Sequence, residues 1–226
     1  MISKNDIVAV NASASVVAAK AVDITAEFYR ILFRESPELL PFFNRTNQSS
    51  GRQRLALAAA VIAFAQHINN LGVLDSMIDL VAHKHCALNI LPEHYSIVTK
   101  HLVQAISLVL SEDLMPYTIC AWNEALNELS KRMYTREEAL YKAAEGREGG
   151  WRGAEAFTIA EKKFVTESTC EITFRPAASR QFQFTPGQFI TVSAPCTAAI
   201  LVLCCAHLQS LPTSHRNSMA RRCGVS

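Results

Sequence analysis

Glycine is scarce in the first 145 residues of this sequence and then suddenly frequent. Residues 1–145 contain only Gly51 and Gly72, whereas the stretch EGREGGWRG at 145–153 packs together Gly146, Gly149, Gly150 and Gly153. Because glycine interrupts regular structure, its scarcity favours long elements before 145, and its clustering predicts a linker over 146–153.

Other absences exclude whole classes of protein. None of the seven cysteines forms a C-x-x-C pair, which argues against a structural zinc site. A net charge of +2 gives no case for nucleic acid or an acidic membrane as partner. The longest apolar run, 198–206, is too short to cross a bilayer, and polar residues at 4–6 argue against a signal peptide. We expect a soluble cytoplasmic protein with mostly free thiols.

Apolar residues before the linker recur at helical spacing. Three stripes illustrate this pattern: Leu57, Val61, Phe64 and Ile68; Leu74, Met77, Ile78, Val81 and His85; Val98, Leu102, Ala105, Ile106 and Val109. Pro37, Pro92 and Pro116 fall between stripes, where proline suits a helix start. The pattern predicts six or seven helices between Ser3 and Tyr141.

The period changes to two after the linker, which predicts three or four short strands over 154–195. The alternating pairs are Phe157/Ile159, Ile172/Phe174 and Phe182/Phe184, and TPGQF supplies a turn before 189–192. Residues 196–226 have no convincing period, three arginines and no acidic residue. We assign no fold to that segment.

The stretch LVAHKHCALN, at 80–89, contains two histidines two residues apart. On a helix, such residues point about 200° apart, so both cannot bind one metal from the same face. His85 continues an apolar stripe and should face the interior, whereas His83 should face solvent. A buried imidazole whose other N–H is held can bind a metal; the alternative is a core histidine satisfied by a carbonyl. His94 and His101 could share another face, although most such pairs lie on the surface.

Several segments resemble the globin domain of the flavohaemoglobins. They are FYRILF (28–33), ELLPFFNRTNQ (38–48), GRQRLAL (51–57), HKHCALNILPEHYSIVTKHLVQAI (83–106), AW (121–122) and REEALY (136–141). GGWRG (149–153) looks like the family's hinge, and FTPGQFITV (184–192) looks like the start of its FAD-binding barrel. The resemblance implies an all-α globin domain binding haem b at 1–145, a hinge at 146–153, and an incomplete antiparallel barrel of the ferredoxin-reductase type at 154–195.

The resemblance also assigns residues to the proximal side of the haem. It makes His85 the iron ligand, in agreement with the helical-face argument, and pairs it with Tyr95 and Glu137. A buried carboxylate that accepts the imidazole N–H gives the ligand imidazolate character, which favours activation of dioxygen over storage. Tyr95 would donate its hydroxyl to the same carboxylate. Taken alone, Glu137 could equally be a solvated helix residue beside Glu138; only the family register separates the two.

On the distal side, Tyr29 and Gln53 match the family's ligand-stabilising residues. A hydroxyl and an amide aimed at bound dioxygen stabilise its partial negative charge in a dry pocket. Oxygen-storage globins more often have histidine at the position of Gln53. The combination of tyrosine with glutamine therefore favours a reaction of bound dioxygen over its storage. The alternatives are a tyrosine ring packed in the core and a glutamine exposed at a helix start.

The resemblance implies four further cofactor contacts. Leu57 would narrow the space above the iron, and Phe43 would wedge the haem, a role for which Phe42 competes. Lys84 would adjust the haem potential through its charge, or is an ordinary surface lysine. Phe189 stands after PGQ, where the family's flavin barrel usually has tyrosine.

The implied activity is nitric oxide dioxygenation, which converts nitric oxide and dioxygen into nitrate. Complete family members reduce the haem through FAD and NAD(P)H. No tyrosine follows Tyr141, so the Arg-x-Tyr-Ser/Thr flavin motif is absent from the barrel segment. There is also no nucleotide-binding glycine loop. We therefore expect a truncated or frame-shifted chain, or an error in the gene model, that needs an external reductase. The alternatives are an oxygen-binding or sensing globin without sustained catalysis, and a non-functional fragment.

Overall fold

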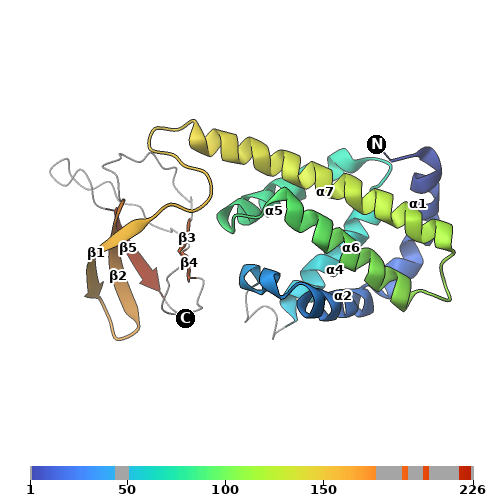
Figure 1. The fold of residues 1–226 in the computed structure, drawn as a ribbon, viewed down its shortest axis with the longest axis horizontal. Helices are drawn as coiled ribbons and strands as arrows, with labels where there is room; N and C mark the ends of the chain where they lie inside the picture. Colours follow the sequence, from blue (N-terminus) through green and yellow to red (C-terminus); the bar gives the residue numbers. More distant parts are fainter. Residues whose placement is uncertain (1, 44–50, 177–189, 193–200, 204–218, 225–226) are drawn as a thin grey trace. The chain divides into compact units, whose positions relative to one another are not determined.

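The chain folds into two compact units, each described by itself. The computed structural model describes residues 2–43, 51–176, 190–192, 201–203 and 219–224 (Figure 1). The first unit comprises Met1–His85 and Ile90–Glu137, and the second comprises Cys86–Asn89 and Glu138–Ser226. The first unit is helical, and the second contains the end of the last helix and every strand of the described residues.

The described residues form six α-helices and two 3-10 helices. In chain order these are α1 (Lys4–Ala19), α2 (Ala21–Glu35), η1 (Pro37–Phe42), α4 (Arg52–Gln66), η2 (Leu71–Leu74), α5 (Asp75–Ala87), α6 (Pro92–Val109) and α7 (Pro116–Glu145). The three prolines each begin a helix, as predicted, because the first helical position has no intrahelical use for an N–H group. Among these helices none is by itself long and apolar enough to cross a membrane; α1 and α2, bent by 87° at their junction, meet the criterion only as a pair.

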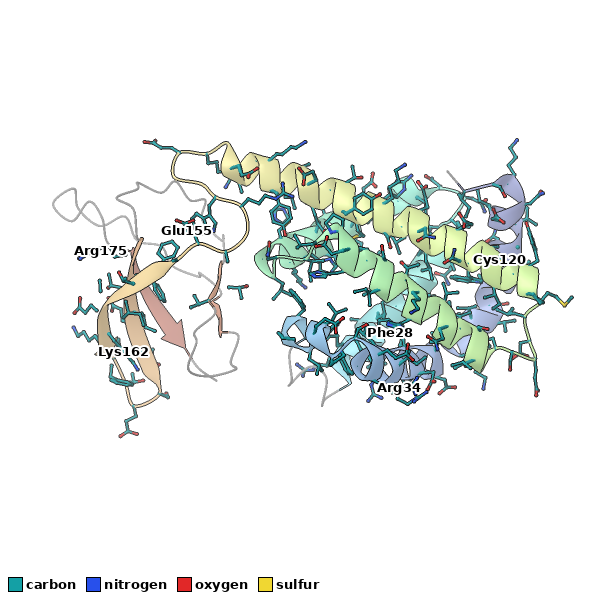
Figure 2. All side chains as sticks on the ribbon, in the orientation of Figure 1. Phe28, Arg34, Cys120, Glu155, Lys162 and Arg175 are labelled. Atoms are coloured by element: carbon teal, nitrogen blue, oxygen red, sulfur yellow. The ribbon has the colours of Figure 1, made fainter. Side chains whose placement is uncertain are left out.

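The core of the first unit lies where α2 packs against both α4 and α6, and where α1 packs against α4. Phe28 of α2 is 1% exposed, whereas Arg34 of the same helix stands outside (Figure 2). The predicted stripe of α4 is confirmed, since Val61, Phe64 and Ile68 are all buried. Burial of such residues removes apolar surface from water and stabilises the helix pairs.

A tight turn links α5 to α6. Asn89 adopts the left-handed conformation, with φ 56°, and the Ile90 N–H donates to the His85 carbonyl at 3.0 Å. The Asn89 N–H donates to the Cys86 carbonyl at 3.1 Å. These two bonds form a Schellman motif, which satisfies the last carbonyls of α5. Because Pro92 begins α6 directly afterwards, the first turn of α6 lies close to His85.

The described residues of the second unit form two small sheets. Strands β1 (Phe157–Phe164) and β2 (Thr169–Pro176) form an antiparallel hairpin in which Phe157 is opposite Pro176. Strand β5 (Met219–Gly224) pairs with the other edge of β2, and β3 (Ile190–Val192) pairs antiparallel with β4 (Leu201–Leu203). Strands β4 and β5 lie in the segment to which the sequence assigned no fold.

The hairpin of the second unit has a very small core. Phe174 is buried, and Phe157, Ile172 and Val192 pack against it. Ile159 is an exception to the predicted alternation: it is 61% exposed, and the strand register shifts between Ile159 and Glu161. Phe182, Phe184 and Phe189 lie outside the described residues.

The glycine-rich segment is folded against the end of α7. Gly150 is required there by close approach, because a Cβ atom at this position would stand 1.8 Å from the Ala144 carbonyl oxygen. The Arg152 guanidinium donates two hydrogen bonds to the Glu138 carboxylate, at 2.6 and 3.1 Å, and lies 4.7 Å from the centre of the Tyr141 ring. The predicted linker is therefore an ordered turn that is fastened to the last turns of the helix.

Candidate functional site

Three helices meet at the imidazole of His85. His85 lies near the end of α5, Tyr95 in the first turn of α6, and Glu137 in the second half of α7. The Nδ1 atom of His85 is 2.8 Å from the Tyr95 hydroxyl oxygen and 2.8 Å from Oε1 of Glu137. The Tyr95 hydroxyl donates to the same Glu137 oxygen. The structure thus brings together the three residues that the sequence predicted for the proximal side.

These contacts favour one tautomer of the imidazole. Glu137 is 2% exposed, and a buried carboxylate requires donors around it. Tyr95 provides one donor, and an Nδ1–H on His85 provides the other. With its proton on Nδ1, the neutral ring carries its lone pair on Nε2, on the opposite side. The arrangement therefore presents one free imidazole nitrogen as a metal ligand, with its partner N–H held by a carboxylate.

Geometry separates Glu137 from Glu138, which the residue types alone could not do. Glu138 binds Arg152, at 2.6 Å, and Lys142, at 3.7 Å, and is half exposed. The hydrogen bond from Arg152 lowers the pKa of the Glu138 carboxyl, and the charge of Arg152 lowers it further. Of the two neighbours, Glu137 contacts His85, whereas Glu138 binds Arg152 of the glycine-rich segment that follows α7.

Three other histidines, His83, His94 and His101, have different surroundings. His83 is exposed and lies 4.0 Å from Asp79, one turn earlier on α5. His94 accepts a hydrogen bond from the Leu91 N–H at 3.1 Å and thereby caps α6. The expectation of a surface position is wrong for His101, which is 2% exposed. Its Nε2 lies 3.2 Å from the hydroxyl of Ser36, at the end of α2, and that tertiary partner could not be seen in a helical pattern.

A second cluster surrounds Tyr29 on α2. Its ring centre lies 4.8 Å from that of Phe28, 5.6 Å from that of Phe33 and 5.7 Å from that of Phe43. Phe33 and Phe43 also contact each other edge to face. Burial among these rings raises the pKa of the Tyr29 hydroxyl above its ordinary value, so this group stays a neutral donor.

The same contacts distinguish Phe43 from Phe42. Phe43 packs against Tyr29, whereas the ring of Phe42 lies 4.7 Å from that of His94. The two adjacent phenylalanines thus point to different partners, and Phe43 is the one that joins the cluster of the predicted distal tyrosine.

Gln53 and Leu57 lie on one face of α4, one helical turn apart, and both are half-buried. Helix α4 begins after Gly51, whose φ of 72° is left-handed, and it packs against the helix that carries Tyr29. Lys84 is exposed beside His85. Phe189 lies outside the described residues.

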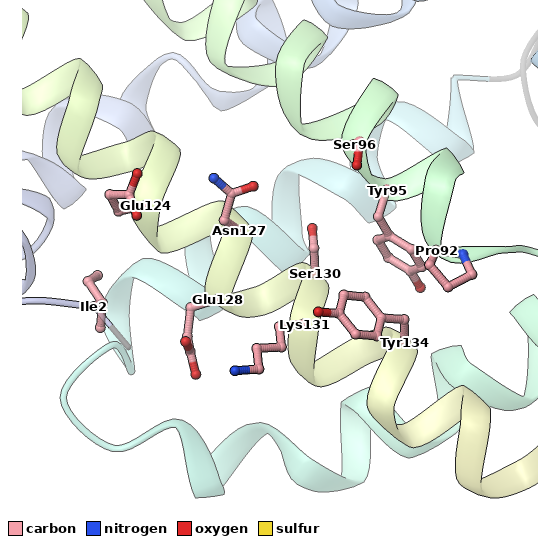
Figure 3. Close-up of a pocket in the computed structure, with 10 residues that line it drawn as sticks. All are labelled: Ile2, Pro92, Tyr95, Ser96, Glu124, Asn127, Glu128, Ser130, Lys131 and Tyr134. Carbon is pink, nitrogen blue, oxygen red and sulfur yellow. The ribbon is translucent and has the colours of Figure 1, made fainter.

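A cleft of about 320 Å³ lies between α6 and α7 (Figure 3). Tyr95 and Tyr134 form part of its wall, and most of the other residues that line it are polar. Of the residues predicted for the site, Tyr95 is the one that reaches this cleft. Its polar lining is unlike the apolar surroundings that a large planar cofactor requires.

The donor set fits an iron porphyrin better than a bare ion. Within the part of the chain that the structure describes, no group of three or more His, Cys, Asp or Glu side chains could hold a metal ion. A bare ion held at His85 would therefore lack further protein ligands among the described residues. A porphyrin would supply nitrogen ligands of its own and could accept an imidazole as an additional ligand.

Comparison with known proteins gives consistent matches. The family described as Globin matches residues 26–133. Flavohemoprotein A of Dictyostelium discoideum is 36% identical over 197 residues, covering 87% of this chain and 49% of that protein. The flavohemoprotein of Bordetella pertussis is 40% identical over 187 residues, covering 81% of this chain and 46% of that protein. The chain thus spans about half the length of the curated relatives it matches.

Solved structures agree with these matches. The flavohemoglobin of Malassezia yamatoensis, with bound FAD and heme, aligns with a TM-score of 0.80 at 25% identity and covers 100% of this chain and 58% of that chain. A bacterial globin from Campylobacter jejuni aligns at 0.59 with 35% identity, covering 62% of this chain and 99% of that chain. An engineered carbene transferase, made from a proposed nitric oxide dioxygenase of Rhodothermus marinus, aligns at 0.59 with 29% identity, covering 63% and 98%.

These matches confirm the globin fold and the resemblance to flavohaemoglobins, with strands after the helices like the start of their FAD-binding part.

Proposed function

Since this chain belongs to the globin family, we propose that its helical unit binds haem b through Nε2 of His85. The observation that carries the proposal is the contact of His85 Nδ1 with Tyr95 and Glu137, both at 2.8 Å. A carboxylate that holds the far N–H fixes the ring orientation and makes the ligand nitrogen a stronger electron donor. We assign residues 1–145 to this domain, 146–153 to a hinge, 154–195 to a partial FAD-type barrel, and 196–226 to no domain.

We further propose that the chain carries out nitric oxide dioxygenation. A bound haem would supply the redox-active iron at which nitric oxide and dioxygen combine into nitrate. His85, held by Glu137 and Tyr95, would bind the iron from the proximal side and increase its electron density. This arrangement favours chemistry on dioxygen over its reversible storage.

Tyr29 and Gln53 would act on the opposite side. The Tyr29 hydroxyl is buried among aromatic rings and remains protonated, so it can donate a hydrogen bond to a partly negative oxygen atom. Gln53, on the helix that packs against α2, would supply an amide donor. Preorganised donors in a dry pocket stabilise developing charge without reorganisation. Phe43 and Leu57 would shape the pocket, and Lys84 would influence the haem potential from the surface.

Each cycle of this reaction requires one electron to return the iron to its ferrous state. The segment after Tyr141 contains no tyrosine and therefore no Arg-x-Tyr-Ser/Thr flavin motif. The proposal therefore assigns electron delivery to FAD and NAD(P)H chemistry located outside these 226 residues, on a reductase. Phe189 is proposed only as a residue of the partial barrel.

A two-stage reaction tests the proposal. Purified, reduced and oxygenated protein is mixed with nitric oxide, and nitrate is counted per haem; the expected yield is about one, because a single electron is available. A flavin reductase with NADPH is then added, and consumption of nitric oxide should become continuous. Nitrate formation below one per haem at both stages would contradict dioxygenation.

The second candidate is an oxygen-binding or sensing globin without sustained catalysis. The match to the bacterial globin of Campylobacter jejuni, which is covered over 99% of its length at 35% identity, favours this alternative. It predicts the same single burst in the first stage, and no continuous reaction when the reductase is added.

A further inference from the structure

Helices α5 and α7 lie outside the closest backbone packing of the first unit. That packing joins α2 to α4 and α6, and α1 to α4, and neither α5 nor α7 takes part in these described pairings. Ile78 and Ala82 are its buried residues. The helix that carries the proposed iron ligand is therefore positioned largely by side chains.

Two of the described polar contacts connect α5 with α7. The first is the contact of His85 with Glu137. The second joins Asp79 of α5 to Arg136 of α7: the Arg136 Nε–H donates to Oδ1 of Asp79 at 2.6 Å, and a terminal guanidinium nitrogen contacts the same oxygen. Asp79 precedes His85 by six residues, or about 9 Å along the helix axis. Two contacts this far apart fix both the axial position and the rotation of α5 against α7.

On α7 the two contacts come from consecutive residues. Arg136 immediately precedes Glu137, so any displacement of Arg136 along or around the helix also displaces the buried carboxylate. Both partners of the ion pair are about two-fifths exposed, with exposed fractions of 42% and 44%. An exposed pair adds little to global stability, but it can still restrict where one weakly packed helix lies.

We propose that Arg136 and Asp79 are positioning residues for the proximal site: their ion pair holds α5 so that Glu137 keeps its hydrogen bond to His85. This inference rests on the proposed role of His85 as haem ligand. Loss of the pair lets α5 shift, lengthens the contact between Glu137 and His85, and reduces the imidazolate character of the ligand.

The test compares Arg136→Gln and Asp79→Asn with a matched control, Arg132→Gln. Arg132 lies one turn earlier on α7, is 40% exposed, and pairs at 3.9 Å with Glu128 of its own helix. The measurement is the iron–histidine stretching band of the ferrous, ligand-free protein, recorded by resonance Raman spectroscopy. We expect a broader band at lower frequency in both test variants, and the wild-type band in the control. Haem loss to an acceptor globin should accelerate about two- to fivefold in the test variants.

Two further variants decide whether the effect passes through Glu137. In the Glu137→Gln background, Arg136→Gln should cause no additional shift, because the hydrogen bond it protects is already weakened. The exchanged pair Asp79→Arg with Arg136→Asp should restore the wild-type band. The inference is overturned if Arg136→Gln leaves the band as Arg132→Gln does. A wild-type protein without any iron–histidine band would instead overturn the proposed function itself.

Discussion

The surroundings of His85 and those of Tyr29 differ in how they control a polar side chain. His85 is held by hydrogen bonds to a hydroxyl and to a buried carboxylate, contributed by two other helices. Tyr29 is held by three aromatic rings, and two of these belong to its own helix. The carboxylate beside His85 gives its imidazole ring partial negative character. The aromatic rings around Tyr29 keep its hydroxyl protonated and neutral.

One helical unit therefore provides two different electrostatic environments, one for an imidazole and one for a phenol hydroxyl. A carboxylate that accepts from an imidazole increases its basicity, which suits a metal ligand. Apolar burial disfavours the ionised phenolate, which suits a hydrogen-bond donor. Substitutions at either cluster test whether these two properties depend on the contacts described.

The largest expected effect comes from His85→Ala. Removal of the only proposed iron ligand should abolish the haem Soret band of the purified protein. The control is His83→Ala, whose side chain is exposed two residues earlier and should leave the band unchanged. A normal band in His85→Ala, measured by visible absorption after hemin is supplied, would place the ligand elsewhere.

Tyr29→Phe should accelerate dissociation of oxygen about ten- to hundredfold, because a hydrogen bond to a partly charged oxygen, worth about 1.5–3 kcal/mol, is lost. Stopped-flow or flash photolysis of the reduced protein gives the rate. Tyr117→Phe is the matched control, since that hydroxyl is exposed and bonds to Asp6. Equal rates in the two variants would remove Tyr29 from the proposed distal side.

The raised pKa of Tyr29 gives a prediction for alkaline pH. Since the pKa is higher in the folded state than its ordinary value of 10.0, the neutral hydroxyl stabilises the fold fully below that value. This stability is lost as the pH rises above it toward the folded-state pKa, by about 1.4 kcal/mol per pH unit. Urea unfolding between about pH 9 and pH 11 should show a shallower loss in Tyr29→Phe than in the wild type. The same slope in both proteins would mean that the hydroxyl ionises freely.

The smallest expected effect is that of Glu137→Gln. The amide keeps the shape of the side chain but removes its charge, so the iron–histidine stretching band should move to lower frequency while haem stays bound. Glu138→Gln is the control, because Glu138 bonds to Arg152 and not to the histidine. An unmoved band in Glu137→Gln would show that the carboxylate does not act on the ligand.

Helix positions could be predicted because proline and apolar spacing are local signals. Pro37, Pro92 and Pro116 begin helices where the sequence placed them, and Phe64 and Ile106 are buried on the predicted faces. Strand signals were weaker: Ile159 alternates correctly in sequence yet is exposed, although it lies opposite the buried Phe174. Spacing along one strand does not show how much of the paired face is covered.

Contacts between helices could not be predicted from spacing in the same way. The bond between His101 and Ser36 and the ion pair between Asp79 and Arg136 join residues 65 and 57 positions apart. Apolar spacing shows in which direction each side chain points from the helix axis. It does not show which residues of a second helix lie beside that side chain.

The sequence by itself determined which histidine of the pair faces inward, since 3.6 residues per turn set the direction of every side chain on a helix. It also determined where helices begin and where the glycine-rich joint lies. Residue types and spacing did not separate Glu137 from Glu138 or Phe43 from Phe42, and the family resemblance selected Glu137 and Phe43. The contacts that distinguish the members of each pair are visible in the tertiary structure alone. In both pairs the residue types are the same, and the choice depends on where α5, α6 and α2 approach them in space.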